Sequence, residues 1–515
     1  SHVVAWVNSQ YAVFNKTGTL LLGPINGNTL FAGVGNNCES TNRGDPILQY
    51  DRLADRWILS QFAFSAGANA TPPYFQCIAV STSGNPLGTY VRYSVAFSNT
   101  SPSGFNDYGK LGVWPDGYYT AYNMFNSGTT FTGAGLCVSD RVKMLAGDPA
   151  ATTLCAPFAS YAGGGSFLPA DLEGTTLPTN SSQGGIFIRQ STAPALRLLK
   201  LKADFTASTV TLTDGLGGAA GSFVNIPITL TRACNGTGGT CVAQPGTTNL
   251  LDTLGDRMMY RLAYRNISGV DRLVVSMSED VDGAGARSAA IRWFEIRNPF
   301  GAAPTLFQNA TYDPGASGDR WMSSMATNRC GDIGLSYNVV NAGTSLKPSI
   351  GVTGRLSSDA VNTMQAETVT TTGTGSQTGG LTRWGDYSTM QIDPSDDVTF
   401  WYISQYLAAD GSFNWRTRIA SAKFTTCAPT AAGVTVSGRV ISGAAGRGLT
   451  GAVVRLTDQN GGVRNAVTSR LGTFSFGDVE PGQTYVISVV SRRFNFAPRV
   501  IQVVDNVTDL ELMPE

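Results

Sequence analysis

The sequence predicts an all-β protein, made of a β-propeller of about seven blades (six to eight fit the pattern) followed by a small β-sandwich. Glycine accounts for 60 of the 515 residues, and threonine, serine, asparagine, valine and tyrosine are abundant, as short strands joined by tight turns require. The Glu-, Lys- and Ala-rich runs that form helix surfaces are missing. A phrase that begins at Asn106 also returns near Gly385, and repetition along a long chain is typical of propellers and other repeat folds.

The repeated phrase is one supersecondary unit that occurs twice. Its copies span residues 106–119 and 385–394. In each copy an Asp-Tyr pair, which starts at Asp107 or Asp386, leads into two apolar residues spaced two apart, then a turn with proline, then an aromatic strand. An aspartate ahead of a strand most simply caps a turn through backbone N–H groups. We therefore expect both aspartates to cap turns and the aromatic rings to pack between blades.

Strand signals recur at blade-like intervals through the first 427 residues, and a second echo, Asp-Arg-Trp, occurs at residues 55–57 and 319–321. About 60 residues per unit suits a propeller with long loops. The candidate blades lie around residues 3–33, 45–100, 107–145, 160–210, 255–310, 318–355 and 380–425.

A domain boundary follows Cys427. Small residues at 428–433 predict a linker between a propeller over residues 1–427 and a sandwich over residues 434–515. In the C-terminal part apolar residues alternate, as at Phe474 and Phe476, and strong turn signals separate the short strands.

Two sets of segments carry a resemblance to known families. The first set resembles the carboxypeptidase regulatory-like domain, a transthyretin-like sandwich, which implies a stalk, spacer or assembly module; it comprises residues 436–440, 451–456, 472–476 and 479–485. The second set resembles a group of large secreted bacterial proteins that are predicted β-propellers; it comprises residues 45–52, 255–266 and 383–387. This second resemblance implies a fold and a secreted location, and no activity.

Cysteine usage points to disulfides. None of the eight cysteines forms a CxxC pair, so we expect disulfides in an oxidising compartment rather than a zinc site. The pairing expected from chain order is Cys38 with Cys77, Cys137 with Cys155, Cys234 with Cys241, and Cys330 with Cys427. We read Ser1 as a processed or truncated end, with any signal peptide upstream, and expect a protein that is secreted or displayed at the cell surface.

Charge and hydropathy exclude two classes of partner. Lysine and arginine balance aspartate and glutamate at 36 each, without the basic footprint of a nucleic-acid binder. No apolar run approaches the roughly 18 residues that indicate a membrane span.

Histidine chemistry is excluded as well. The single histidine, His2, lies at the end of the chain, so Ser-His-Asp, Cys-His and histidine-based metal sites cannot be built. Pairs of carboxylates could still cleave glycosidic bonds. The carboxylate candidates are Asp107, Asp116, Asp386 and Glu295, with a turn-capping role preferred for the two echoed aspartates.

Calcium is the one cofactor that the sequence suggests. Asp280 and Asp282 lie in an acidic, glycine-containing segment, 279–285, that resembles part of an oxygen-ligand loop but lacks the later ligands. A solvated turn is the preferred reading, and no other cofactor is expected.

The composition favours a secreted, non-catalytic structural or adhesive protein that self-associates at the cell surface or in an extracellular fibre, filament or matrix. With little net charge to keep copies apart, lateral association is easy. The expected partners are other copies of the chain or a cell-surface glycan. The alternative is a carbohydrate-binding protein, or a glycoside hydrolase or lyase that uses carboxylates on a propeller face.

Overall fold

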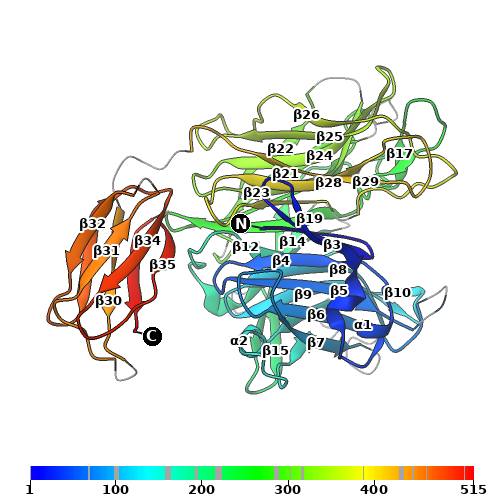
Figure 1. Cartoon of the computed structure of the whole chain (residues 1–515). Coiled ribbons are helices and arrows are strands. Elements are labelled where there is room, and N and C mark those ends of the chain that lie inside the picture. Colours follow the sequence, from blue (N-terminus) through cyan, green and yellow to red (C-terminus); the bar gives the residue numbers. More distant parts are fainter. Residues whose placement is uncertain are drawn as a thin grey trace. The chain divides into compact units, whose positions relative to one another are not determined.

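A computed structural model of the chain describes most of its residues (Figure 1). The described ranges are 2–65, 67, 70–97, 104–156, 164–191, 195–214, 223–283, 289–301, 303–314, 318–386, 388–427, 434–443, 446–459, 461–503 and 505–514. They divide into two compact units, residues 1–392 with 400–422 and residues 393–399 with 423–515. The predicted linker, 428–433, lies outside the described residues, and the predicted domain limits stay predictions.

Within the described residues, the first unit contains seven groups of three or more strands in chain order, antiparallel within each group; a parallel pair joins the fourth and fifth groups into one nine-stranded sheet. Their strands are β1 (His2–Val7), β2 (Gln10–Asn15) and β3 (Leu20–Asn26); β4 (Ile47–Asp51), β5 (Arg56–Ala63), β6 (Phe75–Ser81) and β7 (Tyr90–Ala96); β8 (Phe105–Trp114), β9 (Gly117–Asn126), β10 (Thr130–Ser139) and β11 (Thr153–Cys155); β12 (Leu168–Leu172), β13 (Gly185–Gln190), β14 (Ala195–Asp204), β15 (Thr209–Thr213) and β16 (Val224–Pro227); β19 (Met258–Ile267), β20 (Val270–Glu279), β21 (Ala290–Arg297) and β22 (Thr305–Tyr312); β23 (Asp319–Thr327), β24 (Ile333–Asn341), β25 (Leu346–Arg355) and β26 (Thr368–Gly373); and β27 (Thr389–Ile392), β28 (Phe400–Tyr406) and β29 (Arg416–Ala422).

Short elements lie in the connections between these strands. They are the hairpin of β17 (Thr240–Val242) and β18 (Leu251–Asp252), the helices α1 (Asn37–Ser40) and α2 (Arg141–Ala146), and the 3-10 turns η1 (Gly27–Phe31) and η3 (Ser181–Gln183).

The first strand of each sheet faces the first strands of its neighbours, which is the arrangement of a β-propeller. Strand β4 packs on β8, β8 on β12, β19 on β23 and β23 on β27, while β12 and β19 pair in parallel. The ring closes where Gln391 of β27 donates to Gln49 of β4 at 2.8 Å. The propeller prediction is therefore confirmed. Among the described residues, the ring traced by these contacts has six first strands, β4, β8, β12, β19, β23 and β27, whereas the sheet of β1 to β3, in the first predicted blade range, contacts β4 through β1.

Aromatic residues fill the spaces between the sheets, as expected from the echoed phrases. Trp114 packs edge-on against Tyr264 of another blade, with ring centroids 4.7 Å apart. The fully buried aromatic residues include Trp114, Trp293, Trp321, Trp384, Tyr118, Tyr119, Tyr264, Tyr337 and Tyr402. Such rings bury large apolar areas and dominate the packing energy of the core.

Three inner strands carry a bulge near their first residues. The register shifts between Asp107 and Lys110 in β8, and β19 and β23 show the same irregularity near their starts. Within the bulge of β8, Tyr108 has a positive φ of 53°. A bulge of this kind redirects side chains away from the regular alternation of a strand, and bulges are common beside functional sites.

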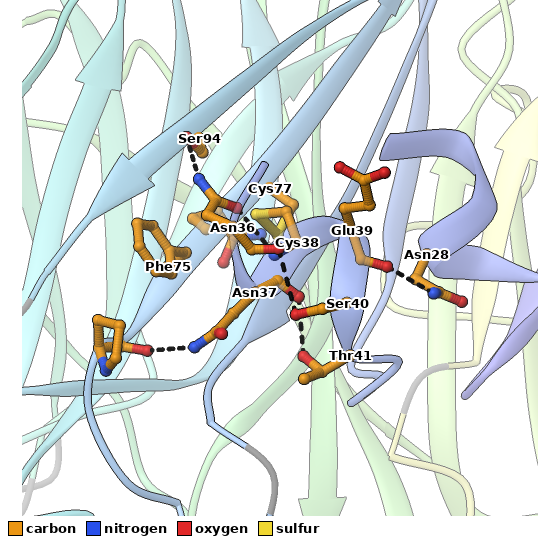
Figure 2. The surroundings of a disulfide bond; sticks show 12 residues. Asn28, Asn36, Asn37, Cys38, Glu39, Ser40, Thr41, Phe75, Cys77 and Ser94 are labelled. Atoms are coloured by element: carbon orange, nitrogen blue, oxygen red, sulfur yellow. Dashed lines mark hydrogen bonds between the residues drawn. A yellow bond between two sulfur atoms is a disulfide. The ribbon is translucent and has the colours of Figure 1, made fainter. Parts of the chain in front are cut away.

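Disulfides join the pairs expected from chain order: Cys38 to Cys77, Cys137 to Cys155, and Cys234 to Cys241. Cys330 and Cys427 are disulfide-bonded too, and none of the described cysteines is free. Figure 2 shows the first bond, which ties the one-turn helix α1 to β6.

The same helix is also held by asparagine side chains (Figure 2). Asn36 accepts a hydrogen bond from the Cys38 amide at 2.9 Å and donates to Ser94 at 2.9 Å. So short a helix lacks the internal hydrogen bonds to be stable alone, and these contacts with the neighbouring sheet replace them.

The second unit contains a two-layer sandwich. One sheet has the order β33-β30-β36 and the other β32-β31-β34-β35. The strands are β30 (Val434–Val440), β31 (Val453–Thr457), β32 (Val463–Val467), β33 (Thr473–Val479), β34 (Gln483–Val490), β35 (Arg499–Val503) and β36 (Val507–Leu512). Alternate residues such as Val436, Val454, Phe474, Phe476 and Ile487 form its core, which confirms the sandwich.

Candidate functional site

Aspartates stand at the start of five inner strands of the propeller. In sequence they are preceded by glycine in four cases and by asparagine in the fifth; they are Asp45, Asp107, Asp256, Asp319 and Asp386. Because the first strands of neighbouring blades run side by side around one axis, their starts gather at one end of the propeller. Residues far apart in the chain thereby become neighbours.

Lys110 lies at the centre of this group. It is 1% exposed and comes from β8, immediately after the bulge. Its ammonium nitrogen lies 3.3 Å from the centroid of the Tyr108 ring and donates to the Gly109 carbonyl at 3.2 Å. Burial lowers the pKa of Lys110 to about 7, although the carboxylates of Asp45 and Asp386 favour its charged form.

Asp107 and Asp386, the two echoed aspartates, both interact with Lys110. Burial raises the pKa of Asp107, while the Tyr108 amide, Lys110 and a side-chain hydrogen bond with Asp45 oppose the rise. Burial likewise raises the pKa of Asp386, against the effects of nearby cations. Asp45 lies within hydrogen-bonding reach of the Asp107 carboxyl group.

These contacts differ in part from the turn caps that the sequence suggested. The Asp107 carboxylate does accept a hydrogen bond from the Tyr108 amide, which is a cap. The Asp386 carboxylate instead forms an ion pair with Arg383, whose guanidinium is three residues away. The neighbouring Tyr387 lies outside the described residues.

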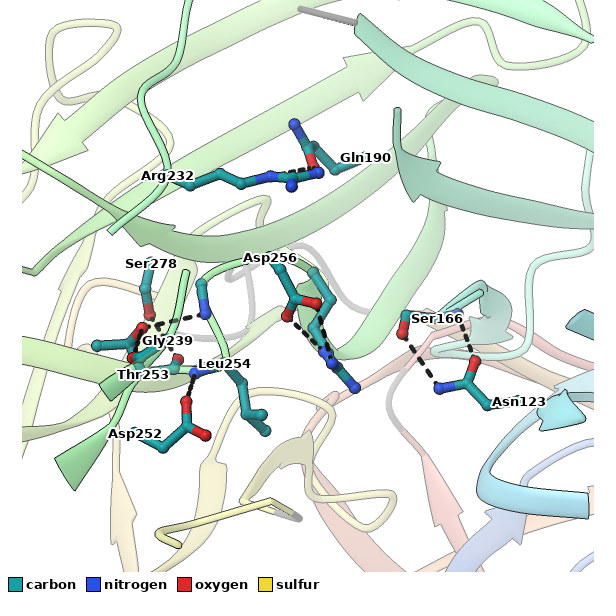
Figure 3. A network of polar contacts seen from close by, with 12 residues as sticks. Asn123, Ser166, Gln190, Arg232, Gly239, Asp252, Thr253, Leu254, Asp256 and Ser278 are labelled. Atoms are coloured by element: carbon teal, nitrogen blue, oxygen red, sulfur yellow. Dashed lines mark hydrogen bonds and ion pairs between the residues drawn. The ribbon is translucent and has the colours of Figure 1, made fainter. Parts of the chain in front are cut away.

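Tyr108 lies between two cations. Lys110 stands over its ring, and the guanidinium carbon of Arg257 lies 5.0 Å from the same centroid. Arg257 is held in turn by Asp256, which accepts two hydrogen bonds at 2.7 and 3.0 Å (Figure 3). Asp252 supports this loop by accepting the Leu254 amide at 2.9 Å, so the arginine is positioned before any ligand arrives.

Exposure increases outward from Lys110. The side chains of Asp386 and Arg257 are 14% and 21% exposed, whereas those of Asp256 and Arg383 reach 39% and 65%. The group of charges therefore extends from a buried lysine to the surface of the propeller. We call Asp45, Asp107, Tyr108, Lys110, Arg257 and Asp386, with their partners Asp256 and Arg383, the Lys110 cluster.

A second polar network fills the propeller axis with buried side chains. Arg261 donates to Asp171 at 2.8 Å, to Glu173 at 2.6 Å and to the Met390 carbonyl at 2.9 Å. All three residues are at most 3% exposed. Tyr260, next to Arg261 on β19, donates from its hydroxyl to the carbonyl of Leu111, next to Lys110 on β8, at 2.9 Å. This hydrogen bond links the two strands that carry the two networks.

The other two carboxylate candidates lie elsewhere. Asp116 follows the far end of β8 and accepts hydrogen bonds from the Tyr119 hydroxyl at 3.1 and 3.2 Å. Glu295 belongs to the third strand of its blade and binds Arg297 at 2.7 Å. The structure thus brings together Asp107 and Asp386 and leaves Asp116 and Glu295 out of the cluster.

Asp280 and Asp282, the residues of the predicted calcium site, occupy a turn. Both oxygens of Asp280 accept backbone N–H groups, from Asn235 at 2.6 Å, Asp282 at 3.2 Å and Gly283 at 2.6 Å. The side chain of Asp280 is buried while Asp282 is exposed. Calcium binding here stays a prediction, and residues 284–288 lie outside the described part of the chain.

Sequence reasoning did not single out Lys110, Asp45, Tyr108 or Arg257 as site residues. Two signals were available in the sequence: the recurrence of Gly-Asp ahead of the inner strands, and a lysine within an apolar strand of a chain that otherwise relies on arginine. Both acquire meaning only once the inner strands are known to start at a common end.

The C-terminal resemblance is confirmed by comparison with known families. The carboxypeptidase regulatory-like domain matches residues 435–512. No curated protein matches the chain. Within the described residues, no helix combines the length and the hydropathy that crossing a membrane requires.

Several solved structures are similar to the chain. An alpha-L-arabinofuranosidase from Clostridium thermocellum ATCC 27405 is 10% identical, with a TM-score of 0.30, over 63% of this chain and 93% of that one. A protein of unknown function from Dyadobacter fermentans DSM 18053 is 12% identical, with a TM-score of 0.31, over 84% and 94%. The polysaccharide lyase Uly1 is 9% identical, with a TM-score of 0.34, over 86% and 89%.

Proposed function

We propose that the protein is a secreted carbohydrate-active protein, which binds a glycan at the Lys110 cluster and cleaves it by carboxylate acid–base chemistry. The observation that carries the proposal is the grouping of three aspartates from different inner strands, Asp45, Asp107 and Asp386, around the buried Lys110. Groups whose pKa values are shifted by burial and by specific charged partners are concentrated at functional sites.

The proposed role of each carboxyl group follows from the direction of its pKa shift and from its neighbours. Burial raises the pKa of Asp107, which suits a group that donates a proton to a leaving oxygen. The two carboxyl groups of a glycosidase stand about 5 to 9.5 Å apart, so Asp45, in hydrogen-bond contact with Asp107, is too close to be its partner. We assign the role of base or nucleophile to Asp386, from another blade; burial raises its pKa, and Arg383 and Lys110 oppose that rise by favouring the ionised form.

Lys110, Tyr108 and Arg257 serve this reaction as positioning residues. The bulge in β8 orients Tyr108 and Lys110, and Arg257 reaches the same tyrosine ring from the start of β19. Because Lys110 is fully buried, its charge stabilises nearby carboxylates more than a solvated lysine would. The exposed members, Asp256 and Arg383, offer oxygens and N–H groups to sugar hydroxyls at the entrance.

The location follows the same proposal. Disulfides persist in oxidising compartments and are rare where thiols are kept reduced, so the bonds at Cys38, Cys137 and Cys234 support secretion.

The non-catalytic structural role expected from composition has less support. Among the described residues we find no feature of the propeller that specifically indicates self-assembly. The Lys110 cluster, in contrast, buries charged groups, which is energetically costly and is not needed to build a purely structural propeller. Adhesion and filament formation stay predictions.

A screen of polysaccharides tests the proposal. The full chain is expected to bind a subset of an immobilised glycan array and to release new reducing ends, or unsaturated ends, from a polysaccharide that contains the same linkage. Failure to bind or cleave any member of a broad panel of neutral and acidic polysaccharides would contradict it.

A further inference from the structure

The sandwich domain has a strong separation of charge between its two ends. Each strand crosses the domain from one end to the other, and each connecting loop joins two strands at a single end of the domain. The loops therefore form two sets, one at each end. Within the described residues, one set comprises 441–443, 446–452, 468–472 and 491–498, and the other comprises 458–459, 461–462, 480–482 and 505–506.

The first set of loops carries arginine and no acidic residue. Arg447, Arg470, Arg492 and Arg493 lie in these loops, all of them exposed. The first residue of β35, Arg499, adds another exposed guanidinium at the same end. We call this the arginine end; Arg439, near the end of β30, borders it and is partly held by the Leu471 carbonyl at 2.8 Å.

The second set of loops carries only acidic charge. Asp458, Glu480 and Asp505 lie there, and the sequence contains no lysine or arginine in these three loops. The chain also enters the domain at this end, at Val434. The arginine end is therefore the end of the domain farther from the point where the chain enters it.

We infer that the arginine end is a binding surface for an anionic polysaccharide that carries carboxylate or sulfate groups. The fork of a guanidinium matches the two oxygens of such groups and binds them by paired, charge-assisted hydrogen bonds. Several exposed guanidiniums lie in neighbouring loops with no carboxylate among the described loop residues. Glu511 of β36 borders this end, so among the described residues arginine outnumbers acid there, and the excess positive charge attracts a polyanion by charge complementarity.

Apolar residues beside the arginines suit the rings of a sugar chain. Phe496 and Pro498 follow Arg492 and Arg493 in the same loop and line a surface hollow together with Arg499, Glu511 and Met513. Half-buried aromatic and proline faces next to charged groups allow a sugar ring to pack while its anionic substituent is held. The surface lies on the second unit and is separate from the Lys110 cluster, so it goes beyond the proposed function.

Binding of fluorescein-labelled, low-molecular-weight heparin and of polygalacturonate to the full chain tests the inference by fluorescence anisotropy. Binding is expected at about 50 mM salt and is expected to weaken by an order of magnitude or more at about 200 mM, because ion release drives it. Uncharged dextran is expected not to bind.

Matched variants locate the surface. The double variant Arg492→Ser/Arg493→Ser is expected to lose about tenfold or more in affinity, since two charge-assisted contacts disappear. Arg455→Ser removes an equally exposed arginine from the middle of β31 and is expected to bind as the wild type does. Equal loss in both variants would show general attraction to a polyanion and would overturn the assignment.

A second copy of the chain is the competing occupant, because the acidic end could meet the arginine end head to tail. Light scattering of the full chain across concentration distinguishes it. The proposal would be overturned if the wild type binds neither heparin nor polygalacturonate and its mass rises with concentration. In that case the mass should return to that of a monomer in both Arg492→Ser/Arg493→Ser and Asp458→Asn. Variants of Asp107 that no longer cleave glycans are expected to bind heparin and polygalacturonate as the wild type does.

Discussion

Replacing Lys110 with methionine tests whether the buried ammonium shapes the pH dependence of folding. Burial lowers the pKa of Lys110 from 10.5 to about 7. The unfolded chain thus holds this proton up to about pH 10.5 while the folded chain releases it near pH 7. The free energy of unfolding therefore rises with pH between about 7 and 10.5. The full gain is present above pH 10.5, where Lys110 is neutral in both states, and it is lost as the pH falls through 7, where the buried lysine becomes charged.

The size of the effect follows from the shift. Between pH 7 and 9 the unfolded state binds close to one more proton than the folded state, so the free energy of unfolding should rise by about 2 kcal/mol from this residue. Lys200, whose pKa burial lowers to about 8, adds a similar rise above pH 8 in both proteins. Its contribution cancels when wild type and Lys110→Met are compared.

The assay is urea unfolding followed by tryptophan fluorescence at several pH values between 7 and 9. The wild type is expected to gain about 2 kcal/mol more than Lys110→Met over this range. The ¹³C-labelled ε-methylene signals of the lysines would report the titration of Lys110 directly. Parallel stability curves for the two proteins, or a Lys110 signal that titrates near 10, would refute the reasoning.

Other substitutions test the propeller frame. Arg261→Met leaves two buried carboxylates without their cation and is expected to cost about 3 to 5 kcal/mol in urea unfolding; an effect below about 1 kcal/mol would show that the axial network is not paired as described. Removing the Cys38–Cys77 bond by serine substitution should cost about 4 kcal/mol, and removing Cys234–Cys241 about 2.5 kcal/mol, because the first closes a loop of 39 residues and the second a loop of 7. Calorimetry would show the larger drop in Tm for the longer loop, and the reverse order would contradict the loop-closure argument.

Much of the fold was predictable because strand and turn signals are local. Alternating apolar residues, glycine-rich turns and the echo at Asp107 and Asp386 predicted the propeller, and the alternation at Phe474 and Phe476 predicted the sandwich. The tight loop between Cys234 and Cys241 likewise fixed its own disulfide. Each of these features depends on residues that are close in sequence.

The site was harder to predict because it depends on residues that are distant in sequence. Asp45, Lys110 and Asp386 converge only through the closure of the ring of blades, and no local pattern marks them as neighbours. The bulge that turns Tyr108 and Lys110 inward is a departure from regular alternation. The predicted turn cap is therefore correct for the contact of Asp107 with the Tyr108 amide, but the prediction did not include the charged groups around Asp107.

The most direct test of the account is glycan cleavage by Asp107→Asn beside Asp116→Asn, two substitutions at opposite ends of the same strand. Once a substrate is known, turnover should fall by about 100-fold or more in Asp107→Asn, because the proton donor is lost, and should stay within about twofold of wild type in Asp116→Asn. Unchanged near-ultraviolet circular dichroism would show that both proteins are folded. Equal turnover in the two variants would contradict a reaction centred on the Lys110 cluster.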